Sequence, residues 1–280
     1  MRIQLLRNAT LLITINKKKL LVDPMLSKAG AMSPIDNSPN NRRNPLVELI
    51  APTNFLQEID AVLLTHTHRD HFDDAARNQL PKDKPILCQP EDKDLLEKSG
   101  FHEIYPIDSV LDWGGITFTP TSGQHGTGEI ALQMAPVSGY VLKSEAEPSL
   151  YIAGDTVYCE DVDNILTKDQ PSLIVVNAGG ARFTIGDPIT MTEDDVVKVC
   201  RKRRMPKSLP CTWRLSIIVF FPEQSYAATL NRKNYQIKYS FHWMVKRWNF
   251  NYNESFSFKN TKRLEPSKNA STECECVYNY

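Results

Sequence analysis

The feature that most constrains this chain is a short apolar run that ends in a cluster of histidines. Residues 61–65 are followed by His66, His68, Asp70 and His71, which gives three histidines and one aspartate within six positions. An apolar run that ends so abruptly predicts a buried strand of an α/β sheet. Because side chains alternate along a strand, His66 and His68 point to the same side where the strand ends.

The cluster has the residue types of a metal site. Neutral imidazole and carboxylate groups together are typical ligands of zinc, iron or manganese. Three of the six histidines in the chain lie here, more than a solvent-exposed polar loop needs. We therefore expect the cluster to bind a pair of divalent metal ions.

Two residues further along the chain are candidates to complete this site. His125 follows a strand and lies between Gly123 and Gly126, so the backbone can approach other groups closely. It is either a third imidazole for one metal or a turn histidine. Asp155 follows Gly154 at the end of an apolar strand. Its carboxylate either bridges two cations or caps an Asx turn.

Asp23 presents a similar choice nearer the N-terminus. It ends the apolar run 19–22 and precedes Pro24. Its carboxylate is either a partner of a metal-binding histidine or a cap of the turn before the proline, and the sequence favours neither role.

The spacing of the cluster resembles His-x-His-x-Asp-His, the signature of the metallo-β-lactamase superfamily of hydrolases. The resemblance covers residues 1 to about 200 and is greatest to the branch that contains L-ascorbate-6-phosphate lactonase. It implies a four-layer αββα sandwich with the metals in a cleft between the loop ends of two sheets. The implied ligands are His66, His68 and His125 for the first metal, Asp70 and His71 for the second, and Asp155 for both.

The resemblance also implies a reaction. A hydroxide held between the metals attacks a carbonyl or phosphorus centre, and Asp70 orients that hydroxide as a catalytic residue. We expect hydrolysis of a lactone, ester, amide or phosphodiester in a small molecule. Zinc is the expected metal, and manganese or iron also suits these ligands.

The remaining apolar runs predict the other elements of an α/β fold. A polar stretch, residues 27–53, is expected to be a long loop at the border of the binding site. Helices are expected from Asp73, over 91–98 and after Thr192. Strands are expected at 3–6, 10–15, 19–22, 85–88, 101–107, 110–113, 116–119, 139–142, 149–153 and 173–176.

The last 80 residues differ in composition from the rest of the chain. Residues 201–280 contain 15 Lys and Arg against 5 Asp and Glu, a net charge of +10, and they contain no glycine and no aspartate. The formal charge of the whole chain is zero, so residues 1–200 carry −10. Average usage would place about six glycines in such a stretch.

This composition coincides with a break in the family pattern. Members of the family carry one more histidine, the last ligand of the second metal, in a context like Val-His-Met-Glu-Ala-x-Asn-His, which this chain lacks. Read one frame over, residues 205–219 permit Ala-Lys-Val-Ile-Ala-Val-His-Met-Glu-Ala-Ile-Asn-His-Cys. We therefore expect a frameshift near residue 200 and a weakened second metal site.

Two domain assignments follow from this hypothesis. Residues 1–200 are expected to form a metallo-β-lactamase-like domain that lacks the last strands and helix of the fold. Residues 201–280 are expected to be an out-of-frame, poorly ordered tail. The competing interpretation is a genuine basic module that contacts nucleic acid through phosphates and stacking, although no recognisable nucleic-acid motif is present there.

Three functional interpretations remain open. The first is a dinuclear hydrolase, the second an iron-containing oxidoreductase with the same ligands, and the third an inactive truncated product with a half-built site. Six scattered cysteines, no signal peptide and no apolar run of membrane-spanning length favour a cytoplasmic protein with reduced thiols and no membrane partner. The sequence does not name the substrate or the oligomeric state.

Overall fold

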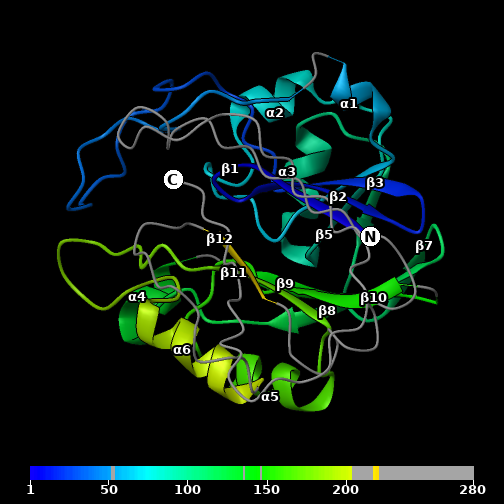
Figure 1. The fold of residues 1–280 in the computed structure, drawn as a ribbon. Helices are drawn as coiled ribbons and strands as arrows, with labels where there is room; N and C mark the ends of the chain where they lie inside the picture. The colour runs from blue at the N-terminus through cyan, green and yellow to red at the C-terminus, as the bar shows by residue number, and fades with distance from the viewer. Residues whose placement is uncertain (52–53, 135, 146, 204–216, 221–280) are drawn as a thin grey trace, which may run out of the picture.

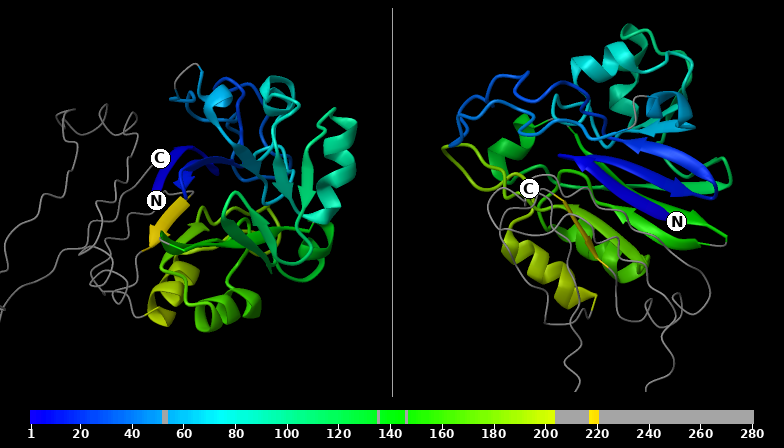
Figure 2. Two further views of the ribbon diagram at one scale, coloured as in Figure 1. Left: turned by 90° about the vertical axis from the view of Figure 1, so that its right-hand side faces the viewer. Right: turned by 45° about the horizontal axis from the view of Figure 1, so that its top comes forward.

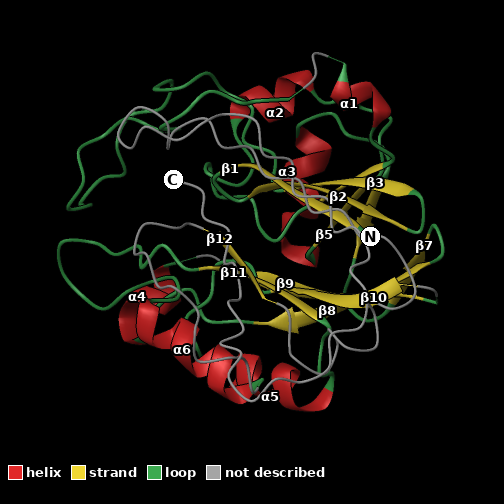
Figure 3. Ribbon diagram, in the orientation of Figure 1, coloured by secondary structure: helices red, strands yellow, loops and turns green. Residues whose placement is uncertain are grey.

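Two six-stranded sheets packed face to face form the centre of the molecule, with helices on both outer faces (Figure 1, Figure 3). The computed structural model describes residues 1–203 apart from 52–53, 135 and 146, together with the strand 217–220. The layers follow in the order helices, sheet, sheet, helices, as the two further views show (Figure 2). This arrangement confirms the expected αββα sandwich.

The first sheet has the strand order β1-β2-β3-β4-β5-β6. Its first three strands form the expected antiparallel meander, and β3 to β6 are parallel. The strands are β1 (Arg2–Arg7), β2 (Thr10–Ile15), β3 (Lys18–Val22), β4 (Ala61–Leu63), β5 (Ile86–Cys88) and β6 (Ile104–Pro106). The carboxyl ends of β3, β4 and β5 therefore lie at one edge of the sheet.

The second sheet has the order β12-β11-β10-β9-β8-β7. The pair β10 and β11 is parallel, and every other pair in this sheet is antiparallel. The strands are β7 (Leu111–Trp113), β8 (Ile116–Ser122), β9 (Ser138–Ser144), β10 (Glu147–Ile152), β11 (Leu173–Asn177) and β12 (Ile217–Phe220).

The helices agree with the sequence where a cap or an apolar stripe marks them. Asp73 caps α2 through the backbone amide of Ala76, and Thr192 begins α6 with a capping box. The helix expected over 91–98 is a 3₁₀ turn, Pro90–Asp92, followed by α3. Helices α1, α4 and α5 were not expected. The helices are α1 (Phe55–Glu58), α2 (Asp74–Gln79), α3 (Lys93–Lys98), α4 (Gly128–Gln133), α5 (Glu160–Lys168) and α6 (Glu193–Lys202).

The strand β12 is a difference from the sequence-based expectation. It lies in the tail that was expected to lack strands, and it pairs antiparallel with β11, with Ile218 opposite Val176. Its sequence, Ile-Ile-Val-Phe, consists of residues that favour strands. The rest of the tail, residues 204–216 and 221–280, lies outside the described residues, so its reading frame and order stay predictions.

Three apolar layers hold the sandwich together. The layer between the sheets contains Ile13 of β2 and Phe118 of β8, both fully buried. A second layer, around Phe72, lies between the first sheet and its helices, and a third, around Val199, lies beneath α5 and α6. Burying a large apolar side chain of this kind stabilises the folded state by about 1.5–3 kcal/mol.

Buried polar groups fasten the start of the long loop 27–53. Arg7 is 3% exposed, and its guanidinium donates to the backbone carbonyls of Met25, Ser27 and Val47. The Asp73 carboxylate, besides capping α2, accepts from the Ser27 amide at 2.8 Å. These bonds satisfy backbone groups that the loop would otherwise bury without partners. They fix the loop beside the turn that carries the histidine cluster.

Candidate metal centre

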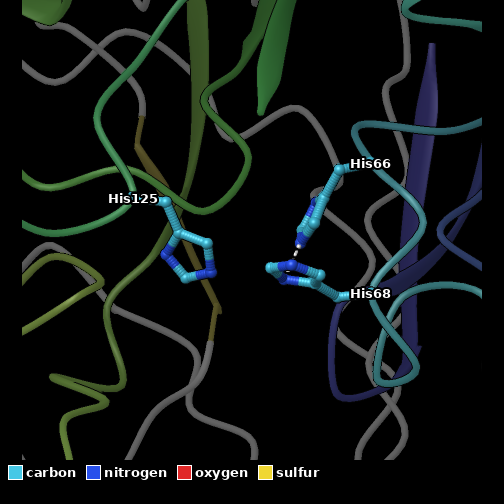
Figure 4. Close-up of side chains that lie close together, drawn as sticks. All are labelled: His66, His68 and His125. Carbon is cyan, nitrogen blue, oxygen red and sulfur yellow. Dashed lines mark hydrogen bonds between the residues drawn. The ribbon is translucent and has the colours of Figure 1, made fainter. Parts of the chain in front are cut away.

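The histidine cluster lies where the strands of both sheets end. His66 and His68 follow β4 of the first sheet, whereas His125 follows β8 and Asp155 follows β10 of the second. Figure 4 shows the His125 ring pointing toward the pair formed by His66 and His68 from the other side of the site. The site is therefore built between the two sheets, as the resemblance implied.

Two groups of side chains have the geometry of metal sites. In the first group, the ligand atoms of His66, His68 and His125 all lie within 4.8 Å of one another, and His66 Nε2 is 3.0 Å from His68 Nδ1. In the second, the same limit holds for His66, His71 and Asp155. All of these residues except His68 are buried.

Outer hydrogen bonds turn three of these rings toward the centre. His71 Nδ1 lies 2.9 Å from the carboxylate of Asp23, and His125 Nδ1 lies 2.8 Å from the carbonyl of Ile189. The Nδ1 of His66 lies 3.1 Å from the Thr65 hydroxyl. When Nδ1 carries the proton and donates it outward, Nε2 keeps its lone pair for a metal.

Asp23 is the partner of a histidine, one of the two roles the sequence left open. Its Oδ2 accepts from His71 Nδ1 and from the Thr65 hydroxyl, at 2.9 and 2.7 Å, and its Oδ1 accepts from the Thr65 amide at 2.8 Å. The carboxylate thus joins the end of β3 to the end of β4. This contact fixes both the turn and the His71 ring.

Burial and the neighbouring charges set the protonation states around the centre. Burial lowers the pKa of His66 well below its usual value, and His71 lowers it further. Burial would also lower the pKa of His71, but the carboxylates of Asp155 and Asp23 outweigh it, and the pKa lies well above the usual value. His66 is therefore neutral at pH 7, as a metal ligand must be, and His71 holds a proton that a metal would replace.

Asp155 is held as a carboxylate between the histidines. Burial would raise its pKa, but the charge and hydrogen bond of His71, followed by His66 and His125, lower it far below the usual range. Its Oδ2 lies 3.2 Å from His71 Nε2 and 3.7 Å from His125 Nε2. Its Oδ1 accepts a hydrogen bond from Asn177 Nδ2, a contact that sequence reasoning missed.

Asp70 lies apart from these two groups. Among the described residues, neither group of three potential ligands includes it. It is partly exposed. Burial and the neighbouring His125 lower the pKa of His68, and the charge of Asp70 offsets part of that lowering. Its assignment as a ligand of the second metal and as a catalytic residue stays a prediction.

The donor set fits a divalent metal. Four imidazoles and one carboxylate converge in a largely buried space, and the outer nitrogens of three imidazoles are already engaged. Nitrogen and carboxylate ligands in this number suit zinc, manganese or iron.

A second buried carboxylate supports the loop that carries the ligands. Asp92 Oδ1 accepts from the hydroxyl of Thr67, the residue between His66 and His68, at 2.7 Å. Asp92 is 7% exposed, and burial raises its pKa to about 6. The nearby Gln89 side chain, at the end of β5, donates to the Pro136 carbonyl of the segment that enters β9.

The comparison with known families agrees with this fold and this site. A family model described as the beta-lactamase superfamily domain matches residues 18–212. The chain belongs to this superfamily. The match contains the histidine cluster, His125 and Asp155, so it covers both groups of potential ligands.

Curated relatives of this chain include one bacterial and one archaeal protein. UPF0173 protein YddR of Bacillus subtilis is 39% identical over 206 residues, which are 71% of this chain and 80% of the relative. UPF0173 metal-dependent hydrolase TV0864 of Thermoplasma volcanium is 26% identical over 196 residues, 69% of this chain and 75% of the relative.

Solved structures similar to this chain agree with the fold described above. An isothiocyanate hydrolase from Delia radicum gut bacteria has a TM-score of 0.67 and 35% identity, over 70% of this chain and 78% of that one. A possible metal-dependent hydrolase from Veillonella parvula has a TM-score of 0.67 and 33% identity, over 70% of this chain and 79% of that one.

Replacing the partner of His71 should weaken metal binding. In Asp23→Asn, the carboxylate that accepts from His71 Nδ1 is lost, and we expect zinc affinity to fall about 10- to 100-fold. Competition with a chromophoric chelator measures the affinity. The matched control is Asp112→Asn, an exposed carboxylate that accepts only from Thr117 among the described side chains. Equal affinities for the two variants would contradict the role of Asp23.

The raised pKa of Asp92 predicts a pH-dependent stability. Because the folded state holds the proton more tightly than the unfolded state, protonation stabilises the wild type as pH falls through about 6. Asp92→Asn lacks this titration. We measure the free energy of unfolding by denaturant at pH 5 and 7.5. Relative to the wild type, the free energy of unfolding of the variant should be about 1–2 kcal/mol higher at pH 7.5 than at pH 5. Parallel pH profiles would show that the buried carboxyl has an ordinary pKa.

Proposed function

We propose that this chain, a metal-dependent hydrolase of the beta-lactamase superfamily, cleaves a lactone, ester, amide or phosphodiester bond in a small molecule. The observation that carries the proposal is the convergence of two ligand groups that share His66, with Asp155 in reach of both His71 and His125. The relatives named metal-dependent hydrolases support it.

The residues of the chain prepare the site for this chemistry. Divalent metals held there would lower the pKa of bound water toward neutrality and polarise an oxygen of the substrate. Asp23 and the Ile189 carbonyl keep His71 and His125 in the orientation that exposes Nε2. His66, with its lowered pKa, is neutral at the working pH without having to lose a proton first. We propose that Asp70, which lies outside both ligand groups, orients an attacking water as a catalytic residue.

Zinc is the metal that we propose, with manganese or iron as alternatives for the same ligands. We propose two ions. The group His66, His68 and His125 is complete as three imidazoles, whereas the group around His71 and Asp155 lacks the additional histidine of the family pattern. The second ion is therefore bound more weakly. If iron occupies the site, the alternative activity is that of an oxidoreductase.

One comparison favours a second candidate substrate class. The isothiocyanate hydrolase with 35% identity acts, by its name, on a compound whose reactive atom is an electrophilic carbon between nitrogen and sulfur. Attack by an activated water on that carbon makes the same demand on the site as attack on a carbonyl. Isothiocyanates therefore join esters and lactones as substrates to test.

The position of the proposed substrate is bordered by two long loops. Arg69, in the histidine cluster, donates to the carbonyls of Ser33 and Pro34 in the loop 27–53. The segment 178–191, which supplies the Ile189 carbonyl to His125, donates from the Thr184 amide to the Asn37 carbonyl at 2.6 Å. Both loops lie on the left side of Figure 1. We propose that they shape the entrance for a small molecule. Separately, no helix among the described residues is long and apolar enough to cross a membrane.

Hydrolysis should depend on the metal and on the first ligand group. We expect the purified chain to hydrolyse at least one member of a panel of lactones, esters, amides, phosphodiesters and isothiocyanates. A chelator should lower the rate at least about 100-fold because it removes the metal. The variant His68→Ala should lower it by a similar factor because the first metal loses a ligand. Zinc titration by calorimetry should show one tight and one weaker site.

The matched control for this experiment is Asp112→Asn, whose side chain is exposed on β7. It should keep the wild-type rate. Hydrolysis that persists after chelation and in His68→Ala would contradict a metal-dependent reaction. Two equally tight zinc sites would contradict the proposal that the second one is incomplete. Absence of both metal binding and hydrolysis would favour the inactive truncated product.

We further propose that the reading frame changes near residue 200. The match to YddR leaves a fifth of that relative and more than a quarter of this chain unaligned, which supports a departure from the family sequence. Resequencing the coding DNA across residues 195–230 should reveal a single-base insertion or loss. An intact frame in an expressed gene would contradict the frameshift and would make the basic tail a genuine part of the protein.

A further inference from the structure

The two oxygens of the Asp155 carboxylate have different surroundings. Oδ2 faces the histidines, 3.2 Å from His71 Nε2 and 3.7 Å from His125 Nε2. Oδ1 accepts a hydrogen bond from the side chain of Asn177. A carboxylate only accepts, so the donor must be the amide nitrogen of Asn177, and the orientation of that amide is fixed by chemistry.

The fold brings Asn177 to this oxygen from a neighbouring strand. Strands β10 and β11 are parallel, with Ile152 opposite Val175, so their carboxyl ends lie at the same edge of the second sheet. Asn177 is the last residue of β11, and Asp155 follows β10 by three positions. The two side chains therefore meet directly above the paired strands.

The backbone alone places Asp155 but leaves the carboxylate free to rotate. Gly154 has a φ of +68°, and a Cβ there would lie 2.9 Å from the Ser138 carbonyl, so the turn is tight and needs glycine. This turn fixes the Cα of Asp155. The side-chain torsion is a separate degree of freedom, and the amide of Asn177 is a group that sets it.

We propose that Asn177 is a positioning residue that occupies Oδ1 of Asp155 and leaves Oδ2 as the atom shared by both ligand groups. The inference rests on the proposed metal-dependent function. A carboxylate can approach two cations with one oxygen or with both, and a donor on Oδ1 competes for the lone pairs of that oxygen. With metals bound, Asn177 would thereby favour the one-oxygen arrangement.

An asparagine suits this task better than a charged donor. A lysine or arginine at this position would bring a positive charge next to the cations that the site is proposed to bind. The neutral amide stabilises the carboxylate without that repulsion, and it leaves the negative charge of Asp155 available to the metals. Asn177 is only partly buried, so its own amide does not need this bond to be satisfied, and the bond serves the buried Asp155 carboxylate.

The test compares Asn177→Leu, which keeps the size of the side chain but cannot donate, with Asn164→Leu. Asn164 is a partly exposed asparagine on α5, outside both ligand groups. Zinc and cobalt titrations by calorimetry give the affinity of each ion, the visible spectrum of the cobalt form reports its coordination, and melting is measured with and without zinc.

We expect Asn177→Leu to bind the weaker ion at least about tenfold less tightly than the wild type and to alter the cobalt spectrum. The rise in Tm on adding zinc should shrink, while the Tm of the metal-free protein changes little. Asn164→Leu should retain wild-type affinity and spectrum. A loss of hydrolysis is not needed for this result, so the inference can stand even if the proposed substrates are wrong.

A merely structural role gives a different pattern. If Asn177→Leu lowers the Tm of the metal-free and zinc-loaded forms equally, with wild-type affinity and an unchanged cobalt spectrum, the inference is overturned. It also fails if the wild-type chain binds no zinc or cobalt, an outcome that overturns the proposed function together with it. Reduced metal affinity in an otherwise inactive protein would support the positioning role and refute only the substrate class.

Discussion

The Asp23 carboxylate is the contact on which the metal centre depends. The residue is 2% exposed, and the two carboxylate oxygens accept from the Thr65 amide, the Thr65 hydroxyl and His71. A buried carboxylate without such donors would be costly, so the three bonds are a condition for its presence in the fold. Through them, the end of β3 determines the course of the chain after β4. The direction of the histidine cluster is therefore decided in the first sheet, before any metal binds.

The second sheet completes what the first sheet begins. His125 and Asp155 lie at strand ends of the second sheet, and each is held by a group outside the cluster, the Ile189 carbonyl for His125 and the Asn177 amide for Asp155. The result is a set of lone pairs directed at one another across the interface between the sheets. Lone pairs at such distances repel unless a proton or a cation lies between them. In the metal-free protein the proton on His71 has this role, because the carboxylates on either side raise its pKa. A metal bound between these residues would replace that proton.

Much of this arrangement could be predicted from particular residues, and the rest could not for physical reasons. The cluster from His66 to His71 was recognisable because rare residue types occur at strand and turn spacing, and Asp155 because it follows an apolar run and a glycine. Asn177 was missed because an asparagine at a strand end is common and its partner is 22 positions away, brought close only by the parallel pairing of β10 and β11. Helix α4 has no buried residue, so no apolar stripe marks it. Helix α5, by contrast, carried a readable signal in buried Val162 and Leu166, four positions apart after an acidic first turn.

The pairing of β11 ties the centre to the part of the chain whose composition differs. Leu173 to Val176 are buried, and Asn177 is paired with Ile217 of β12 in the observed register. A central strand is held in place by hydrogen bonds on both sides, whereas an edge strand is held on one side only. If the residues after Lys202 did not pair with β11, Asn177 would lie at the free edge of the sheet, and the group that orients Asp155 would lose part of its support.

A change of reading frame near residue 200 would then act on the metal centre in two ways. It would remove the last histidine of the family pattern, and it would replace the strand that holds Asn177 with the sequence of the shifted frame. The strand-forming run Ile217–Phe220 allows the second sheet to keep its sixth strand despite the altered composition around it.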